Sequence, residues 1–250
     1  MAKDSTIRKF NRFELKYVLS IENARKFAQA VKSFLNVDSY GEKGKYAITS
    51  LYYDSPDYRF YWEKMEGIKF RRKLRIRYYE KKEPLTNEDP VFVEIKQRTD
   101  RVTQKRRAKL SYKDAIKLCN KGIMPDSYDP KDKATLQEVQ SMVLLYRLRP
   151  TIITSYFRQA YIGTEYDLGL RITFDTNVRY RDVDLDLTSK NIGKFMIRPT
   201  LSVMEIKANE SIPYWLTEMI GEHNVPLVRV SKYCQAIDVA KNKSNLTFNF

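Results

Sequence analysis

The segment RRKLRIRYYE at residues 71–80 alternates cationic with apolar side chains over most of its length. Its cations Arg71, Lys73, Arg75 and Arg77 are spaced two residues apart. Because successive side chains of a β-strand point to opposite faces, one face of this strand carries four positive charges and the other is mainly apolar. Like charges on one face repel each other unless something negative lies among them. The segment therefore predicts a sheet that holds an anion.

Five further strand-like segments share this pattern of one charged and one apolar face. The solvent side of an ordinary antiparallel sheet also carries charged residues, and for a single strand that explanation suffices. Six such faces together are strongly basic with a few carboxylates. They favour a surface that binds an anionic ligand over an ordinary solvent-exposed face. The charged residues of the five segments are Arg12, Glu14 and Lys16; Glu94, Lys96 and Arg98; Lys105, Arg107 and Lys109; Arg171 and Asp175; and Glu205 and Lys207.

The chain predicts about eight strands and several helices, which is the make-up of an α+β protein. Helices that pack on the apolar strand faces would leave the charged faces pointing inward. A sheet of this polarity that closes into an antiparallel β-barrel, with helices packed outside, encloses a cationic tunnel. No linker-like segment divides the sequence, so residues 1–250 are expected to form a single domain. Strands are expected at 12–19, 46–54, 71–79, 91–97, 102–110, 150–162, 168–180 and 199–208, and helices at 21–35, 55–66, 111–122, 135–148, 212–223 and the end of 229–240.

The charge and the rare residue types narrow the class of protein. Lys and Arg number 46 against 31 Asp and Glu, a surplus of 15 that favours an anionic partner. The single histidine, His223, excludes a multi-histidine zinc site. Two distant cysteines, Cys119 and Cys234, favour a reducing compartment over a disulfide framework. The sequence has no signal-like start and no apolar stretch long enough for a bilayer, so a soluble cytoplasmic protein is expected.

The enclosed cationic face favours a compact ligand that is dense in negative charge, and a row of phosphates fits best. A nucleic-acid groove would add exposed aromatic rings that stack on bases, whereas most of the 18 tyrosines fall within strand and helix patterns. No nucleic acid partner is therefore expected. Glu14, Glu94 and Glu205 on these faces either pair with neighbouring cations or hold Mg²⁺ or Mn²⁺, hard cations that prefer oxygen ligands and bridge phosphates.

Seven short motifs, taken in order, resemble one protein family. They are FELKY, SLYYDSPDYRFYWEK, KLRIRYY, VFVEIKQR, LRITFDT, SVMEIK and VSKY. Each motif is weak alone, but their order and spacing from Arg12 to about Ala240 are specific. Together they resemble the polyphosphate polymerase (vacuolar transporter chaperone, VTC) domain, which belongs to the triphosphate tunnel metalloenzymes, also called the CYTH-like superfamily.

The resemblance implies a β-barrel tunnel that binds triphosphate. It also implies synthesis of inorganic polyphosphate from the γ-phosphate of ATP, with Mn²⁺ or Mg²⁺ as cofactor. By motif, the residues that contact phosphate are Lys16, Arg75, Arg77, Lys96, Arg158, Arg171, Lys207 and Lys232, with Arg12, Lys73, Lys105, Arg107 and Lys109 as further candidates. Glu205 resembles the metal-binding glutamate, and Glu14 and Glu94 are additional candidates. For the family's lysine on the strand after VEIK, spacing favours Lys109, and Lys105 stays open.

The chain departs from the family pattern at its first motif. Tunnel triphosphatases begin with Glu-x-Glu-x-Lys, whereas this sequence has Arg12, Glu14 and Lys16 at those positions. An arginine in place of the first metal-binding glutamate favours the polymerase branch over two-metal hydrolysis. Eukaryotic members also carry membrane helices, so export of the product is expected to need a separate membrane partner.

Three other functions remain open from the sequence. The same site could pass the phosphoryl group to water, as a tripolyphosphatase or nucleoside triphosphatase. A non-enzymatic protein could bind polyphosphate or nucleotide without turnover, and a nucleic-acid-binding protein would bind RNA or DNA in a salt-sensitive way. The preferred metal, the length of the product and the oligomeric state are not fixed by the sequence.

Overall fold

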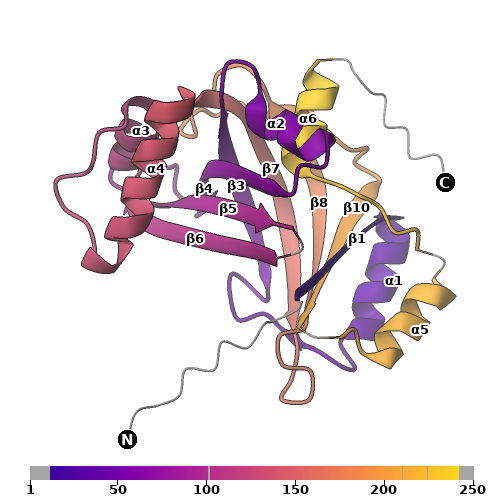
Figure 1. The fold of residues 1–250 in the computed structure, drawn as a ribbon. Helices are drawn as coiled ribbons and strands as arrows, with labels where there is room; N and C mark the ends of the chain where they lie inside the picture. The colour runs from indigo at the N-terminus through magenta and orange to yellow at the C-terminus, as the bar shows by residue number, and fades with distance from the viewer. Residues whose placement is uncertain (1–11, 101, 210, 224, 242–250) are drawn as a thin grey trace, which may run out of the picture.

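The computed structural model describes residues 12–100, 102–209, 211–223 and 225–241, and eight long strands form its antiparallel sheet. Their order is β1-β10-β8-β7-β3-β4-β5-β6 (Figure 1). The eight predicted strands are confirmed; two short strands were missed because two residues carry no periodic pattern. The strands are β1 (Arg12–Ser20), β3 (Lys45–Asp54), β4 (Phe70–Tyr79), β5 (Pro90–Thr99), β6 (Val102–Ser111), β7 (Arg149–Ile162), β8 (Arg171–Arg181) and β10 (Leu201–Asn209), with β2 (Asn36–Val37) beside β7 and β9 (Lys194–Phe195) beside β8.

The sheet is bent so that β4, β5 and β6 run across the direction of β3, β7, β8 and β10 (Figure 1). Within the described residues β1 and β6 end the strand order, and no ladder joins them. Lys96 of β5 nevertheless lies 3.0 Å from Glu14 of β1, Nζ to Oε2, so the two ends of the sheet face each other. The predicted barrel is therefore a bent, barrel-like sheet that hydrogen bonds do not close, and its concave face carries the charged residues.

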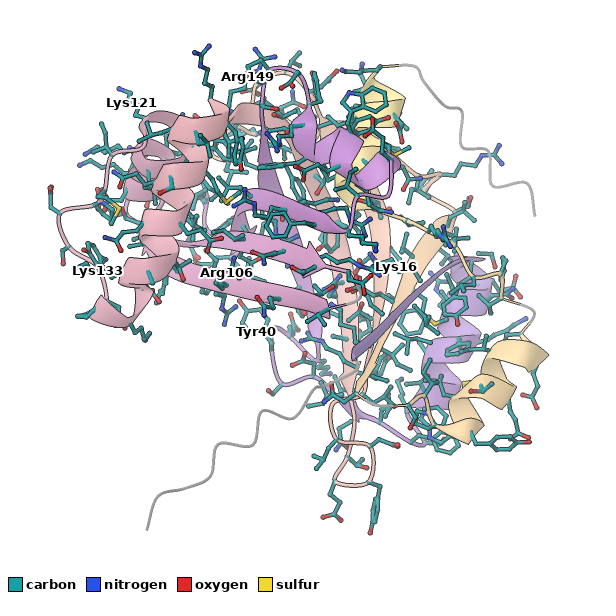
Figure 2. The ribbon with its side chains drawn as sticks, in the orientation of Figure 1. Lys16, Tyr40, Arg106, Lys121, Lys133 and Arg149 are labelled. Carbon is teal, nitrogen blue, oxygen red and sulfur yellow. The ribbon has the colours of Figure 1, made fainter. Side chains whose placement is uncertain are left out.

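Two helices cover the outer face of β4, β5 and β6. They are α3 (Tyr112–Lys121) and α4 (Lys133–Tyr146), and the apolar face of the strands beneath them includes fully buried Leu74, Ile76 and Ile95. Arg106 of β6, which Figure 2 labels, also points to this outer side, because its guanidinium lies 2.6 Å from the carboxylate of Glu138 in α4. The apolar faces therefore lie under helices, as the alternation predicted.

A second pair of helices covers β1, β10 and β8 on their outer face. Here α1 (Ile21–Val31) and α5 (Tyr214–Glu222) bury Phe27 and Leu216 against Ile172 and Ile206 of the strands. The predicted outward direction of these two isoleucines is thereby confirmed. The two outer layers together leave the concave face as the side of the sheet that receives the charged residues.

The remaining helices, α2 (Arg59–Met65) and α6 (Lys232–Ala240), lie together at one end of the concave face (Figure 1). The segment before α6 runs beside β1, where the backbone N–H of Val228 donates to the carbonyl of Lys16. This pairing covers the free edge of β1, which would otherwise be open to other strands. The segment predicted to begin extended and turn helical does so, and it brings the first turn of α6 to the cavity described below.

The helix ends follow the sequence signals. Ser20 and Ser111 accept hydrogen bonds from backbone N–H groups of the first turns of α1 and α3, and Gly122 ends α3 with φ of 66°. Among the described helices α4 is the longest, with 14 residues. In the part of the chain that the structure describes, no helix combines the length and apolar character needed to cross a membrane.

Asp54, at the end of β3, joins α2 to α6. Its carboxylate is fully buried and accepts hydrogen bonds from the backbone N–H groups of Phe60 and Tyr61, at 2.8 and 3.0 Å. It also accepts one from the hydroxyl of Tyr233 in α6. Burial raises the pKa of Asp54, although these hydrogen bonds oppose the rise. The buried carboxylate of Asp54 therefore accepts hydrogen bonds from backbone N–H groups in the first turn of α2. It also fixes α6 against α2 through Tyr233.

We expect Asp54→Ala to lower the free energy of unfolding by about 3 kcal/mol, because the substitution leaves several buried donors without an acceptor. Urea unfolding followed by circular dichroism measures this change. Asp126→Ala is the matched control, since Asp126 is an exposed loop aspartate, and it should leave the transition midpoint nearly unchanged. Equal midpoints for the two variants would contradict the role given to Asp54.

Candidate functional site

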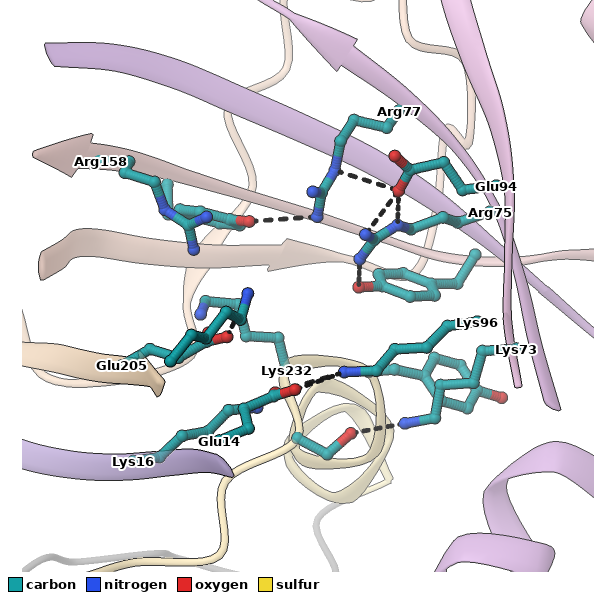
Figure 3. A pocket seen from close by; sticks show the side chains of 15 residues that line it. Glu14, Lys16, Lys73, Arg75, Arg77, Glu94, Lys96, Arg158, Glu205 and Lys232 are labelled. Carbon is teal, nitrogen blue, oxygen red and sulfur yellow. Dashed lines mark hydrogen bonds and ion pairs between the residues drawn. The ribbon is translucent and has the colours of Figure 1, made fainter. Parts of the chain in front are cut away.

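A cavity of about 120 Å³ opens on the concave face of the sheet (Figure 3). Side chains from β1, β3, β4, β5, β7, β10 and the start of α6 line it. Among these lining residues, eight are cations and three are carboxylates, a surplus of five positive charges. The lining residues are Glu14, Lys16, Tyr52, Lys73, Arg75, Arg77, Glu94, Lys96, Tyr156, Arg158, Glu205, Lys207, Ser231, Lys232 and Tyr233.

The register of the sheet explains why these residues meet. Directly paired residues of neighbouring strands share a face. Lys16 is paired with Glu205 across β1 and β10, and Arg75 is paired with Glu94 across β4 and β5. The alternation that the sequence shows within each strand is therefore continued from strand to strand, and the charged residues form one surface.

Arg75 and Arg77 share the buried carboxylate of Glu94. The Nε and Nη2 atoms of Arg75 lie 2.8 and 2.6 Å from Glu94 Oε2, and Arg77 Nε lies 3.9 Å from the same oxygen. Burial alone would raise the pKa of Glu94, but Arg75, Arg77 and Lys105 outweigh it and lower this pKa to about 2. Glu94 is thus an ionised partner that holds the two arginines in place, and its role as a metal ligand stays a prediction.

Two tyrosines extend the arginine cluster. Arg75 Nη1 donates to the hydroxyl of Tyr52 at 3.0 Å, and Arg77 Nη2 donates to that of Tyr156 at 3.3 Å. Burial would raise the pKa of Tyr52, but Arg75, Arg77 and Lys73 lower it to about 8. These cations are therefore strong enough as a group to stabilise an additional negative charge at the cavity wall.

Arg158 and Lys232 are both held by Asp175, which lies on β8 directly behind the cavity. Arg158 binds its carboxylate with Nε and Nη2, at 2.7 and 2.8 Å, and Lys232 Nζ lies 2.6 Å from Oδ2. Asp175 is fully buried, and although burial opposes ionisation, Arg158 and Lys232 keep its pKa below the ordinary value. The carboxylate therefore fixes a cation from β7 beside a cation from α6.

The β1 and β10 wall alternates cations with carboxylates. Lys16 lies 3.1 Å from Glu14, Lys207 lies 2.7 Å from Glu205, and Lys96 reaches Glu14 from β5. Burial opposes ionisation of both carboxylates, but neighbouring lysines lower the pKa of Glu14 to about 2 and hold that of Glu205 well below its usual range. Both groups are therefore ionised acceptors inside the cavity.

Glu14 and Glu205 are the carboxylates that fit a divalent cation. They lie on neighbouring strands close enough to repel each other, and each oxygen pair faces the cavity. A magnesium-like ion in a phosphate site takes one or two carboxylates and completes its shell with phosphate oxygens and water, so two glutamates suffice. Among the described residues there is no group of three or more His, Cys, Asp or Glu side chains that could hold a metal ion without such a ligand.

One predicted lining residue does not reach the cavity. The expectation that Arg171 lines it is wrong, because the guanidinium lies 2.7 Å from Asp38 and donates to the hydroxyl of Tyr46 at 2.8 Å. Asp38 follows the short strand β2, so the sequence pattern gave no sign of this pairing. Asp38 balances the charge of Arg171 here, and the predicted contact of Arg171 with phosphate stays a prediction.

The other candidates differ in position. Lys73 lines the cavity and donates to Ser231 Oγ at 2.7 Å. Lys105, Arg107 and Lys109 lie on the outer strand β6 and do not line the cavity; they are exposed, with Lys105 3.4 Å from Glu94. The side chain of Arg12 lies outside the described residues, so its predicted contact with phosphate stays a prediction.

Sequence reasoning missed several members of the site. Asp175 was visible on the charged face of its strand, but its link to Arg158 and Lys232 depends on the distance between segments far apart in the chain. Tyr52 and Tyr156 alternate with apolar residues, and their contact with arginines has no sequence signal. Ser231 and Tyr233 flank Lys232 in the motif VSKY, so their position beside a predicted site residue was the signal that could have found them.

Comparison with solved structures shows the fold. An adenylate-cyclase-like protein from Bacillus halodurans matches 88% of this chain and 95% of its own, at a TM-score of 0.51 and 14% identity. An adenylyl-cyclase-like protein from Hippeastrum, with a dominant triphosphatase activity, matches 95% of this chain and 98% of its own, at 0.52 and 13% identity. The chain therefore has the fold of the CYTH-like triphosphate tunnel proteins, which confirms the predicted fold class.

Comparison with known sequences is more specific. Vacuolar transporter chaperone complex subunit 4 of Schizosaccharomyces pombe is 24% identical, in a match that covers 76% of this chain and 31% of that protein. The subunit 4 of Trypanosoma brucei brucei is also 24% identical and matches 76% of this chain and 28% of that protein. The chain thus spans less than a third of the length of these relatives. Residues 11–241 match the model of the VTC domain, and the chain belongs to the VTC domain family.

Proposed function

We propose that this protein is a polyphosphate polymerase that transfers the γ-phosphate of ATP to a growing polyphosphate chain in the cationic cavity. The observation that carries the proposal is the surplus of positive charge, which is five among the lining residues and four once Asp175 behind them is counted. Partly buried cations in this number are costly unless an anion of comparable charge lies among them. A triphosphate supplies that charge in a compact form, and membership of the VTC domain family supports the same substrate class.

The arginines are suited to hold phosphate oxygens. Arg75, Arg77 and Arg158 present planar guanidinium groups whose positions are fixed by Glu94 and Asp175. Because these carboxylates hold the arginines before any ligand arrives, little order is lost when phosphate binds. The lysines of the cavity would act as point charges along the same path, and Lys232 from α6 lies beside Arg158 because both bind Asp175.

Phosphoryl transfer needs mainly positioning and electrostatic stabilisation, so a nucleophilic side chain is not required. In this proposal the nucleophile is a terminal oxygen of phosphate or of the growing chain. The fixed cations would bring it in line with the γ-phosphate and stabilise the charge that develops on the leaving ADP.

Glu205, with Glu14, would hold a divalent cation that arrives with the nucleotide, Mn²⁺ or Mg²⁺. Bound there, the ion would supply positive charge that offsets the charge of the phosphates. Glu205 is the stronger candidate, because Glu14 is shared between Lys16 and Lys96 whereas Glu205 has one direct partner, Lys207. We further propose that the protein is cytoplasmic and that a separate membrane partner receives the product; the relatives are named as subunits of a complex.

Hydrolysis is the second candidate function, and the likeness to a fold neighbour with triphosphatase activity favours its consideration. It would use the same cavity with water as nucleophile. Incubation of the pure protein with ATP and Mn²⁺, followed by a gel that resolves and stains polyphosphate, separates the two. We expect a ladder of polyphosphate together with ADP. Release of orthophosphate without polymer would instead identify a hydrolase, and binding of ATP without turnover would identify a non-enzymatic protein.

We expect Glu205→Gln to lower Mn²⁺-dependent turnover by about a hundredfold or more, because glutamine keeps the shape of the side chain but loses the charge that holds a hard cation. ATP binding should survive, since the cationic residues remain and one repelling carboxylate is lost. Initial rates against Mn²⁺ concentration, with ATP affinity measured by calorimetry, test both statements.

Glu138→Gln is the matched control. Glu138 forms a similar pair, 2.6 Å from Arg106, but on the outer face under α4. This variant should keep the rate of the unmodified protein. If Glu205→Gln turns over normally at ordinary Mn²⁺ concentrations, Glu205 only balances Lys207, and the metal ligand must be sought at Glu14.

A further inference from the structure

The register of β4, β5 and β6 places like charges directly opposite one another at one rim of the cavity. Arg71 is paired with Arg98, and Lys73 is paired with Lys96, which is paired in turn with Lys105. Directly opposed like charges destabilise a sheet. Deeper in the cavity the same strands avoid this arrangement, because Arg75 is paired with Glu94. At this rim the register therefore places no carboxylate directly opposite these cations, although the side chains of Lys96 and Lys105 reach Glu14 and Glu94.

Two more cations approach this rim from other elements. Lys64 of α2 has a lowered pKa because of burial and then because of Arg71, with Lys73 and Arg229 as further repelling charges. Burial and then Arg98 likewise lower the pKa of Arg71. We call Lys64, Arg71, Arg98 and Arg229 the outer cationic rim. Within the described residues, none of the four forms an ion pair with a carboxylate, and Arg98 and Arg229 are exposed to solvent.

The rim continues the cavity without a break. Lys73 lines the cavity and lies on the same face of β4 as Arg71, two residues away. Residues two apart on a strand are separated by roughly 6.6 Å, so successive cations can contact different phosphates of one extended chain. A linear polyanion that fills the cavity would therefore meet the rim as soon as it leaves the cavity on this side.

The other end of β4 is built differently. Its last residue, Tyr79, is in edge contact with Tyr40, at a ring distance of 5.1 Å. Cations near this end have carboxylate partners, since Arg171 is paired with Asp38 and Lys81 with Asp89. Not every cation at this end is paired, because Arg107 lies over the ring of Phe92, which contacts Tyr79, and forms no ion pair with a carboxylate among the described residues. The two ends of β4 therefore differ in that this one has ion-paired cations as well as unpaired ones.

We propose that the outer cationic rim is a binding subsite for the polyphosphate chain beyond the phosphates held in the cavity. This proposal rests on the proposed function, which identifies the ligand as polyphosphate. It adds the location of the growing chain outside the cavity. A triphosphate would be bound by the cavity residues alone, whereas a long chain would contact the rim as well. The rim therefore contributes to affinity for polymer and not to affinity for the short substrate.

The test compares two ligands, tripolyphosphate and long-chain polyphosphate, on the triple variant Lys64→Gln, Arg71→Gln and Arg98→Gln. We expect the variant to lose about tenfold in affinity for the long chain, as three solvent-accessible ion contacts are removed. Its affinity for tripolyphosphate should stay within about twofold of the unmodified protein. Binding of the long chain should also become less dependent on salt, because fewer exposed charges are involved.

The control is the variant Lys113→Gln, Lys117→Gln and Lys121→Gln on α3, which removes the same charge from a helix on the outer face. Figure 2 labels Lys121 well away from Lys16 of the cavity. An equal loss of long-chain affinity in this control would overturn the proposal, because net charge would explain it. Both rim and control variants should fold, since each removes cations that repel their neighbours or face solvent, and thermal unfolding checks this.

Two further outcomes are decisive. If the rim variant binds both phosphate ligands normally but loses binding to phosphatidylserine vesicles that the unmodified protein has, the rim faces lipid and the proposal is wrong. The polymerase assay is independent of these measurements. If the unmodified protein makes no polymer but the rim variant selectively loses long-chain affinity, the proposed transfer is refuted and the subsite is kept. If polymer forms but the rim variant shows no selective loss, the subsite alone is refuted.

Discussion

The structure depends on the balance between repelling cations and a small number of buried carboxylates on the concave face of the sheet. Eight cations line the cavity; seven of them form ion pairs with carboxylates, and Lys73 donates to Ser231 instead. Glu94 and Asp175 each hold two of these cations, and the wall of β1 and β10 alternates the two signs. The carboxylates reduce the repulsion enough for the sheet to form, but they leave a surplus that only an anion can neutralise. Stability of the fold and the surplus of positive charge therefore oppose each other in this cavity.

This balance also requires the unusual placement of the helices. A sheet with a polar concave face cannot form its main core there, so the apolar residues must be buried on the convex side. Helices α3 and α4 bury one half of that side and α1 and α5 the other, around Leu118 and Phe27. A third apolar cluster around Tyr233 fills the end of the concave face beside α6. The cavity is therefore the part of the concave face that no apolar cluster occupies.

The direction of each strand face could be predicted from the sequence, because a period of two leaves a side chain only two choices. Arg75, Lys96 and Glu205 lie in the cavity for this reason. The destination of a long side chain could not be predicted in the same way, and Arg171 is the example: it starts on the expected face but ends on Asp38. Whether the sheet closes into a barrel could not be predicted either. Within the described residues β1 and β6 do not pair, and this depends on how far the whole sheet bends.

The pairing of β1 with β10 has a consequence for the order in which the protein becomes functional. Lys16 is made nearly two hundred residues before its partner Glu205, and Lys232 of α6 follows later. Contacts so distant in the chain form late and slowly. A nascent chain that has not reached Tyr233 therefore has most of its cations but no assembled cavity. Until α6 is made, these charges are presented singly to the surrounding anions, and the cavity is complete only with this helix.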